Sequence, residues 1–130
     1  MIFGHGIDIA QVSRFKKWIT DGNLIERYFN EKEISKVNLT ELTERKLSAL
    51  SQHYAARFAA KEAFSKALGT GISGFELKDV YIMNEDSGKP YIVLEKSASQ
   101  IFDAKCPGGK ILVSLSHESD FAIASVIIEI

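Results

Sequence analysis

The residue types best suited to chemistry are concentrated in residues 57–71, which read Arg-Phe-Ala-Ala-Lys-Glu-Ala-Phe-Ser-Lys-Ala-Leu-Gly-Thr-Gly. The first twelve favour a helix, because they are rich in alanine and contain neither proline nor glycine. Glu62 and Lys66 are four residues apart and therefore share one helix face. A helix that carries a carboxylate and several cations close to a glycine-rich end is suited to binding a metal ion and a phosphate.

A second carboxylate, Asp8, could complete a magnesium site with Glu62. Magnesium takes hard oxygen ligands, usually one or two carboxylates together with water and substrate phosphates. Each carboxylate also has a simpler explanation. Asp8 could cap the helix expected from Val12, and Glu62 could form only a surface pair with Lys66, worth roughly a few tenths of a kcal/mol. The spacing of the residues leaves both explanations open.

Phosphate binding is indicated by the cations and glycines around the same helix. Lys61 and Lys66 would supply positive charge to a diphosphate. The loop Gly69-Thr70-Gly71 would allow backbone N–H groups to approach phosphate oxygens. This loop follows a helix and lacks the phosphate-loop pattern, so its glycines alone are a weak signal.

No nucleophile is indicated by the sequence, which lacks a nucleophile elbow and has a single cysteine, Cys106, without a supporting environment. His117 is expected in a connection between two strands, where functional side chains are often presented. A lone loop histidine is more often solvated than catalytic, so His117 has no assigned role at this point.

The composition is that of one globular domain covering residues 1–130, with 45% hydrophobic and 25% charged residues. No apolar run could span a bilayer, and the net charge of −1 gives no general case for nucleic acid binding. The single cysteine excludes an internal disulfide and fits a reducing cytoplasm. Arg14, Lys16 and Lys17 form either a solvated face or a docking patch for an acidic partner, and spacing alone favours the solvated face.

The elements that must position these residues follow from hydrophobic periodicity. Residues 2–9 alternate as a strand, with two glycines and Asp8 on one face, so that another group can approach this face closely. Asn38 with Glu41 could begin a long helix that ends near Leu68, and Asn30 with Glu33 resembles a capping pair for one further turn. The pattern also predicts helices over 12–21, 24–29 and 97–105 and strands over 80–83, 90–94, 111–115 and 121–128. Strands grouped around a long helix predict an α+β fold with a mainly antiparallel sheet.

Four motifs occur together in one order along the chain. They are Gly6-Ile-Asp8-Ile with Arg14-Phe15, the segment 57–71, Gly88-Lys-Pro90 and Ser114-Leu-Ser-His-Glu118. In this order the chain resembles the holo-[acyl-carrier-protein] synthase family, the short, single-unit branch of the 4'-phosphopantetheinyl transferases. The resemblance runs from residue 2 to the C-terminus, and the central motif is the most specific part of it.

The resemblance implies a fold, a reaction and a cellular role. The long central helix would pack on the mainly antiparallel sheet of a 4'-phosphopantetheinyl transferase-like unit. The enzyme would move 4'-phosphopantetheine from coenzyme A to a serine of apo acyl carrier protein, release adenosine 3',5'-bisphosphate and support fatty acid biosynthesis. The carrier protein would bring the nucleophile, which explains why the chain offers none of its own.

The resemblance also gives each candidate residue a role. Asp8 and Glu62 would hold magnesium, and Lys66 would contact the diphosphate or the leaving oxygen. Arg57, Lys61 and the loop Gly69, Thr70 and Gly71 would bind nucleotide phosphates, while Lys89, Pro90 and His117 would lie near the nucleotide. Arg14 and Lys17 would dock the acidic carrier protein. The serine proton would leave through a metal-bound water or a water held by Glu62.

The family's short members are trimers with sites between subunits, so we expect a homotrimer with contacts along 111–115 and 121–128. Two other functions stay open on the sequence. One is a non-catalytic module that binds coenzyme A or the carrier protein, and the other is a magnesium-dependent hydrolase that uses water in place of serine.

Overall fold

The computed structural model describes residues 1–21 and 23–130. The predicted end of the first helix at Asp21-Gly22 therefore lies partly outside the described residues. The strands are β1 (Ile2–Gln11), β2 (Val80–Asn84), β3 (Pro90–Leu94), β4 (Lys110–His117) and β5 (Phe121–Glu129). The helices are α1 (Val12–Asp21), α2 (Asn23–Tyr28), α3 (Glu44–Leu68) and α4 (Lys96–Lys105), with short 3₁₀ turns η1 (Leu39–Glu41) and η2 (Leu77–Asp79).

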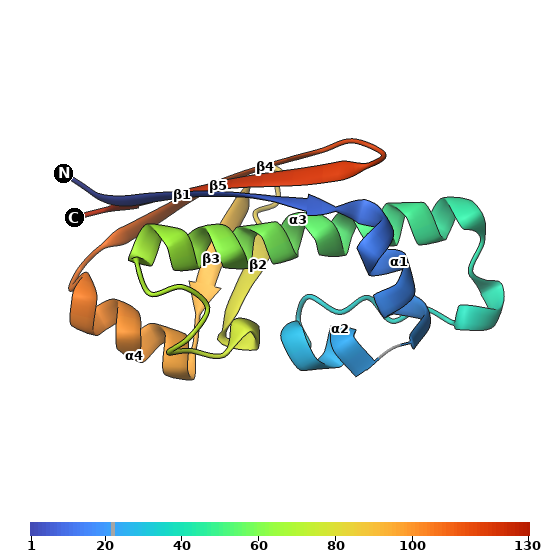
Figure 1. The fold of residues 1–130 in the computed structure, drawn as a ribbon, viewed down its shortest axis with the longest axis horizontal. Coiled ribbons are helices and arrows are strands. Elements are labelled where there is room, and N and C mark those ends of the chain that lie inside the picture. The colour runs from blue at the N-terminus through green and yellow to red at the C-terminus, as the bar shows by residue number, and fades with distance from the viewer. Residues whose placement is uncertain (22) are drawn as a thin grey trace.

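Two antiparallel sheets confirm the predicted α+β class. The larger sheet has the strand order β1-β5-β4, and β2 pairs with β3 as a separate hairpin. Figure 1 shows α3 lying along one face of the three-stranded sheet, with the hairpin behind it and α4 near its C-terminal end. Helix α3 thus stands between the larger sheet and the hairpin and can present side chains to both.

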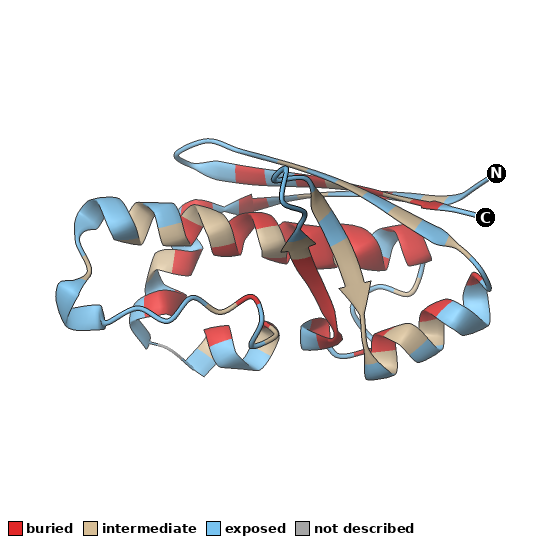
Figure 2. Cartoon of the chain, turned by 180° about the vertical axis from the view of Figure 1, so that it is seen from behind, coloured by how far each residue is buried: buried red, intermediate tan, exposed pale blue. Residues whose placement is uncertain are grey.

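The core forms where α3 meets the sheet. Alternate residues of β5 are buried against it, and the helix contributes a run of alanines to the same cluster. Figure 2 shows that burial increases along α3 from its exposed first turns to its C-terminal half. The buried half contains the segment that sequence analysis singled out. No helix in the described part of the chain has the length and apolar character needed to cross a membrane.

The beginning of α3 differs from the prediction. Asn38 accepts a hydrogen bond from Thr40 N–H and caps only the short turn η1. The long helix begins at Glu44, and Thr43 caps it by accepting from Lys46 N–H at 3.2 Å. Both residues are good N-caps, so the sequence alone could not choose between them. The end near Leu68 is confirmed, because Gly69 closes the helix in the left-handed conformation with φ of 85°.

The outer face of the larger sheet carries many exposed apolar side chains. They include Ile7, Ile9, Leu112, Phe121 and Ile123, beside exposed polar residues such as His5, Ser114 and Ser116. The inner face of the same strands packs on α3. Exposed apolar side chains gathered on one sheet face are typical of a contact surface.

Candidate active site

Close contact between β1 and α3 assembles the first group of site residues. A Cβ added to Gly4 or Gly6 would lie 1.9 Å from the carbonyl oxygen of Ala67 or Ala63, respectively. Only glycine therefore allows the strand to approach the helix backbone this closely. The glycine face predicted from the alternation of β1 is thus the face that meets α3, and it carries Asp8 toward the helix.

Asp8, Glu62 and Lys66 come together at this contact. The Lys66 ammonium donates to Asp8 Oδ1 at 3.1 Å and to the Ile7 carbonyl oxygen at 2.9 Å. Burial raises the pKa of Glu62, the charge of Asp8 raises it further, and the charges of Arg14 and Lys66 oppose the rise. Asp8 therefore pairs with Lys66 and does not cap α1, and the two carboxylates lie close enough to repel each other.

The donor set at this contact fits magnesium. Asp8 and Glu62 offer hard carboxylate oxygens, and their repulsion would be relieved by a divalent cation. Within residues 1–21 and 23–130, no cluster of three or more histidine, cysteine or carboxylate side chains could enclose a metal ion. Two protein carboxylates leave the remaining positions to water and substrate phosphates, which is the usual arrangement for magnesium.

The predicted docking residues lie beside the same contact. The Arg14 guanidinium stands over the rings of Trp18 at 4.9 Å and Phe58 at 5.0 Å. These cation–π contacts hold an exposed arginine in a fixed direction. Lys17 is exposed on the same helix. Because its charge acts on Glu62, Arg14 links this surface to the carboxylate pair.

A second group of site residues lines a cavity of about 330 Å³. Its lining residues are Ala49, Gln52, His53, Ala56, Arg57, Asn84, Gly88, Pro90, Leu115 and His117. The half-buried Arg57 guanidinium donates to Asn84 Oδ1 at 2.9 Å and to the His53 carbonyl oxygen at 3.4 Å. Its Nε atom is buried and has no partner. The guanidinium brings a positive charge to the wall of this cavity, which favours binding of an anion.

The other predicted nucleotide residues are placed unequally. His117 is the last residue of β4, and not in the connection after it as predicted, because the strand extends two residues beyond its expected end. Pro90 begins β3 and lines the cavity, while Lys89 is exposed outside the lining. The loop from Gly69 to Gly71 has positive φ at both glycines and lies at the C-terminal end of α3.

Lys61 requires a correction, because it lies in the interior and not at a phosphate site. Its side chain is fully buried, and its ammonium donates to Glu33 Oε1 at 2.7 Å, to the Leu77 carbonyl oxygen at 3.0 Å and to the Val80 carbonyl oxygen. These three acceptors use all three donors of the ammonium. Successive helix residues point about 100° apart, so Lys61 and Glu62 face different parts of the molecule.

The long-range contacts of three neighbouring residues carried no signal in the sequence. Glu33 pairs with Lys61 across 28 positions, and Asn84 orients Arg57 across 27. His53 binds the Glu33 carbonyl oxygen through Nε2 at 3.0 Å. The spacing of Asn30 and Glu33 did indicate a local contact, and Asn30 N–H does donate to Glu33 Oε1 at 3.1 Å. Residues 31–33 nevertheless form a turn and not a helix.

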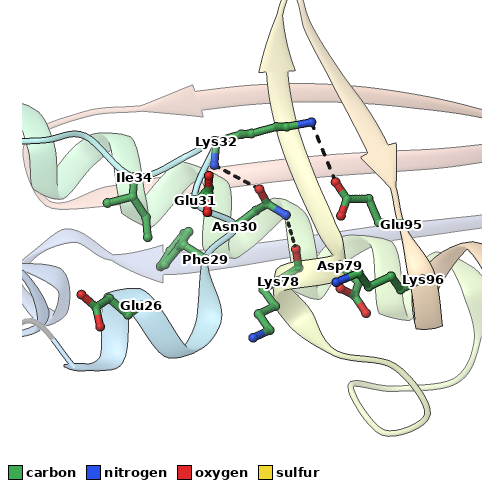
Figure 3. A pocket seen from close by; sticks show the side chains of 10 residues that line it. All are labelled: Glu26, Phe29, Asn30, Glu31, Lys32, Ile34, Lys78, Asp79, Glu95 and Lys96. Atoms are coloured by element: carbon green, nitrogen blue, oxygen red, sulfur yellow. Dashed lines mark hydrogen bonds and ion pairs between the residues drawn. The ribbon is translucent and has the colours of Figure 1, made fainter.

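A larger cavity in the described part of the chain lies elsewhere. It measures about 520 Å³ and is lined by Glu26, Phe29, Asn30, Glu31, Lys32, Ile34, Lys78, Asp79, Glu95 and Lys96 (Figure 3). Lysines and carboxylates alternate around it, and Lys32 Nζ lies 4.0 Å from Glu95 Oε1. This mixture favours no single ligand charge, and the lining contains none of the predicted site residues.

Comparison with known proteins agrees with the fold and the motifs. A sequence model of the 4'-phosphopantetheinyl transferase superfamily matches residues 4–124. The chain is 49% identical to the holo-[acyl-carrier-protein] synthase of Treponema denticola over 129 residues, which cover 99% of both chains.

Two solved structures share the fold. The holo-(acyl-carrier-protein) synthase of Bacillus anthracis in complex with CoA (3',5'-ADP) matches with a TM-score of 0.74 at 32% identity, covering 99% of this chain and 97% of the other. The Helicobacter pylori enzyme in complex with coenzyme A matches with a TM-score of 0.75 at 29% identity, covering 96% and 99%.

The α+β fold, the carboxylate pair and the cavity beside Arg57 therefore occur in a chain whose relatives are 4'-phosphopantetheinyl transferases, some of them solved with coenzyme A. The chain belongs to the 4'-phosphopantetheinyl transferase superfamily and, within it, to the holo-[acyl-carrier-protein] synthase family.

Proposed function

We propose that this enzyme transfers 4'-phosphopantetheine from coenzyme A to a serine of apo acyl carrier protein and releases adenosine 3',5'-bisphosphate, as a step that supports fatty acid biosynthesis. The observation that carries the proposal is the meeting of Asp8, Glu62 and Lys66 beside the exposed Arg14. This group suits a diphosphate electrophile and leaves the attacking hydroxyl to a partner. Relatives solved with coenzyme A support the choice of donor substrate.

The residues of the carboxylate group have separate tasks in this reaction. Asp8 and Glu62 would hold magnesium, which supplies charge neutralisation and polarisation at the diphosphate when bound. Lys66 moves from Asp8 to the diphosphate and offsets negative charge on the leaving oxygen. The serine oxygen forms a bond to the phosphorus of phosphopantetheine, the bond from that phosphorus to the bridging oxygen breaks, and adenosine 3',5'-bisphosphate leaves with the electron pair. The serine proton passes to a water held by Glu62.

The cavity around Arg57 would receive the nucleotide. The positive charge of the Arg57 guanidinium suits a phosphate, and His117 and Pro90 line the remaining wall. Burial and the Arg57 charge lower the pKa of His53, which favours the neutral form of this lining histidine. Lys89 lies one residue before Pro90 and would reach the nucleotide from outside the lining. The loop Gly69, Thr70 and Gly71 would contribute backbone N–H groups to the phosphates.

We expect the two groups of residues to serve a site shared between copies of the chain, as in the trimers that the family resemblance implies. Asp8 is on β1 and His117 is on β4, and these strands form opposite edges of the larger sheet. One coenzyme A could therefore meet both groups where the β1 edge of one copy adjoins the β4 edge of the next. The exposed apolar face of the sheet offers the contact surface, and we expect a homotrimer. Each copy would be one domain of residues 1–130.

The carrier protein would dock on α1. Arg14, fixed over two rings, and Lys17 would meet acidic side chains of the carrier and bring its serine toward Glu62. We expect the reaction to take place in the cytoplasm, which the single buried Cys106 fits. Neither nucleic acid nor membrane insertion enters the proposal.

One assay separates this function from the alternatives. The protein is mixed with coenzyme A, magnesium and apo carrier protein, and the carrier is weighed by mass spectrometry. A mass gain of one phosphopantetheine supports transfer. An unmodified carrier with intact coenzyme A indicates binding only, and release of adenosine bisphosphate without any carrier indicates hydrolysis. Either of the last two results contradicts the proposal.

A further inference from the structure

Lys61 and Glu33 form a closed polar contact in the interior, here called the buried pair. Both side chains have no solvent exposure. The ammonium reaches three acceptors, and the Glu33 carboxylate accepts from Lys61, from Asn30 N–H at 3.1 Å and from Ile82 N–H at 3.0 Å. Because both side chains are buried and hydrogen-bonded, the pair presents no exposed group to a ligand. A buried pair with one partner removed is costly to the fold, so its position is strongly determined.

The buried pair ties α3 to the beginning of β2. Lys61 is on the helix and donates to the Val80 carbonyl oxygen, while Glu33 accepts from Ile82 N–H two residues further along the strand. Two contacts at alternate residues of one strand, Val80 and Ile82, fix both its distance from α3 and its position along the helix. The pair therefore sets how the β2–β3 hairpin sits on α3.

The same strand ends at the nucleotide cavity. Asn84, the last residue of β2, accepts from Arg57 and donates to the Gly88 carbonyl oxygen at 2.9 Å. Arg57 is four residues before Lys61 and shares its helix face. A strand held at Val80 and Ile82 thus delivers Asn84 to Arg57, and this bond aims the guanidinium into the cavity.

We propose that Lys61 and Glu33 are positioning residues for the nucleotide cavity: they fix β2 on α3 so that Asn84 orients Arg57 toward a nucleotide phosphate. This inference rests on the proposed function, because it assigns Arg57 to the nucleotide of coenzyme A. Lys61 thus acts on the cavity indirectly, through β2 and Asn84, and does not contact the phosphate as the sequence predicted. The contribution is to binding of the nucleotide and not to the chemical step at Glu62 and Lys66.

The test replaces the buried pair without leaving a buried charge. The double variant K61M/E33Q preserves side-chain length and removes both charges together. Titration calorimetry with adenosine 3',5'-bisphosphate is expected to show a roughly tenfold weaker Kd than wild type, because a small displacement of a binding group is costly. The KM for coenzyme A is expected to rise by a similar factor, with kcat at saturating coenzyme A within about twofold of wild type. Dephospho-coenzyme A, which lacks one nucleotide phosphate, is expected to show a smaller rise in KM.

A second variant keeps the test decisive if the double variant does not fold. N84A lies at an exposed strand end and leaves the buried pair intact, while it removes the hydrogen bond from Arg57 together with the one to the Gly88 carbonyl oxygen. It is expected to weaken the bisphosphate in the same way. The matched control is F102L, a buried substitution in α4 outside the lining of the cavity, which should lower stability without changing this Kd.

The outcomes are distinguishable from failure of the proposed function. Wild-type protein that transfers phosphopantetheine, together with K61M/E33Q or N84A at wild-type bisphosphate affinity, overturns this inference alone. A loss confined to kcat overturns it as well. Wild-type protein that transfers nothing to the carrier overturns the proposed function and, with it, the inference.

Discussion

Helix α3 has two polar faces, although their residues belong to one continuous motif in the sequence. On one face, His53, Arg57 and Lys61 follow at four-residue spacing and contact the turn at Glu33 and the β2–β3 hairpin. On the other, Glu62 and Lys66 meet Asp8 on β1. Lys61 has no exposed side-chain surface, whereas the side chain of Lys66 is 53% exposed. Two lysines of one motif thus differ in what they can do: the first holds the fold, and the second is available to a substrate.

The largest expected effect concerns the face of α3 that carries Glu62 and Lys66. Replacing Glu62 by Gln removes one of two carboxylates that would hold magnesium, a contribution of several kcal/mol to charge stabilisation. We expect transfer to fall by roughly 10³-fold in the carrier mass assay. The free energy of unfolding measured in urea should change little. A variant with near-wild-type transfer would remove Glu62 from the metal site.

The next effect concerns the face of α3 that carries Lys61. K61M leaves the Glu33 carboxylate buried and uncompensated, and we expect a loss of about 3–5 kcal/mol in the free energy of unfolding. K66M is the matched lysine control, and its exposed side chain should cost no more than about 0.5 kcal/mol. Equal losses in the two variants, measured by urea unfolding, would contradict the distinction between the two lysines.

These two lysines also show how far the sequence could lead. The alternation of β1 correctly predicted the glycine face that brings Asp8 to α3, because period and side-chain size are local properties. The role predicted for Lys61 was wrong, because its partner Glu33 is 28 positions away and no local pattern indicates the pair. Long-range polar contacts depend on how the β2–β3 hairpin packs on α3, and hydrophobic periodicity does not encode that packing.

The strand and helix ends show the same limit at a smaller scale. The strand over 90–94 was predicted from its hydrophobic pattern, and its bounds are confirmed by β3. The start of α3 was placed too early, since Asn38 and Thr43 are chemically equivalent caps. His117 was assigned to a loop because its polar neighbours conceal the continuation of β4.

A smaller effect is expected at the docking surface. R14A removes the cation held over Trp18 and Phe58, and we expect the KM for the carrier protein to rise by roughly tenfold. The KM for coenzyme A should stay near the wild-type value. K105A, at the end of α4, is the control for loss of a positive charge elsewhere. A rise in the KM for coenzyme A alone would reject the docking assignment.

The smallest effect is a change in the titration of the Glu62 carboxyl group. Burial and Asp8 raise the pKa of Glu62, so its carboxylate gains a proton at a higher pH than an ordinary glutamate. Transfer should therefore decline as the pH falls through this raised pKa. Carbon-13 NMR of the Glu62 carboxyl group should show a lower pKa in D8N, which removes a negative neighbour, and a higher pKa in R14A, which removes a positive one. Shifts in the opposite directions would contradict the proximity of these groups.

One measurement tests most directly whether Lys66 serves the chemical step while Lys61 serves the fold. The rate of holo-carrier formation is followed by mass spectrometry at saturating coenzyme A and magnesium for K66M and for K61M/E33Q. We expect K66M to lose roughly 10²-fold or more, because it lacks the charge at the leaving oxygen, while K61M/E33Q stays within about twofold of wild type. Comparable rates in the two variants, or a larger loss in K61M/E33Q, would contradict the account.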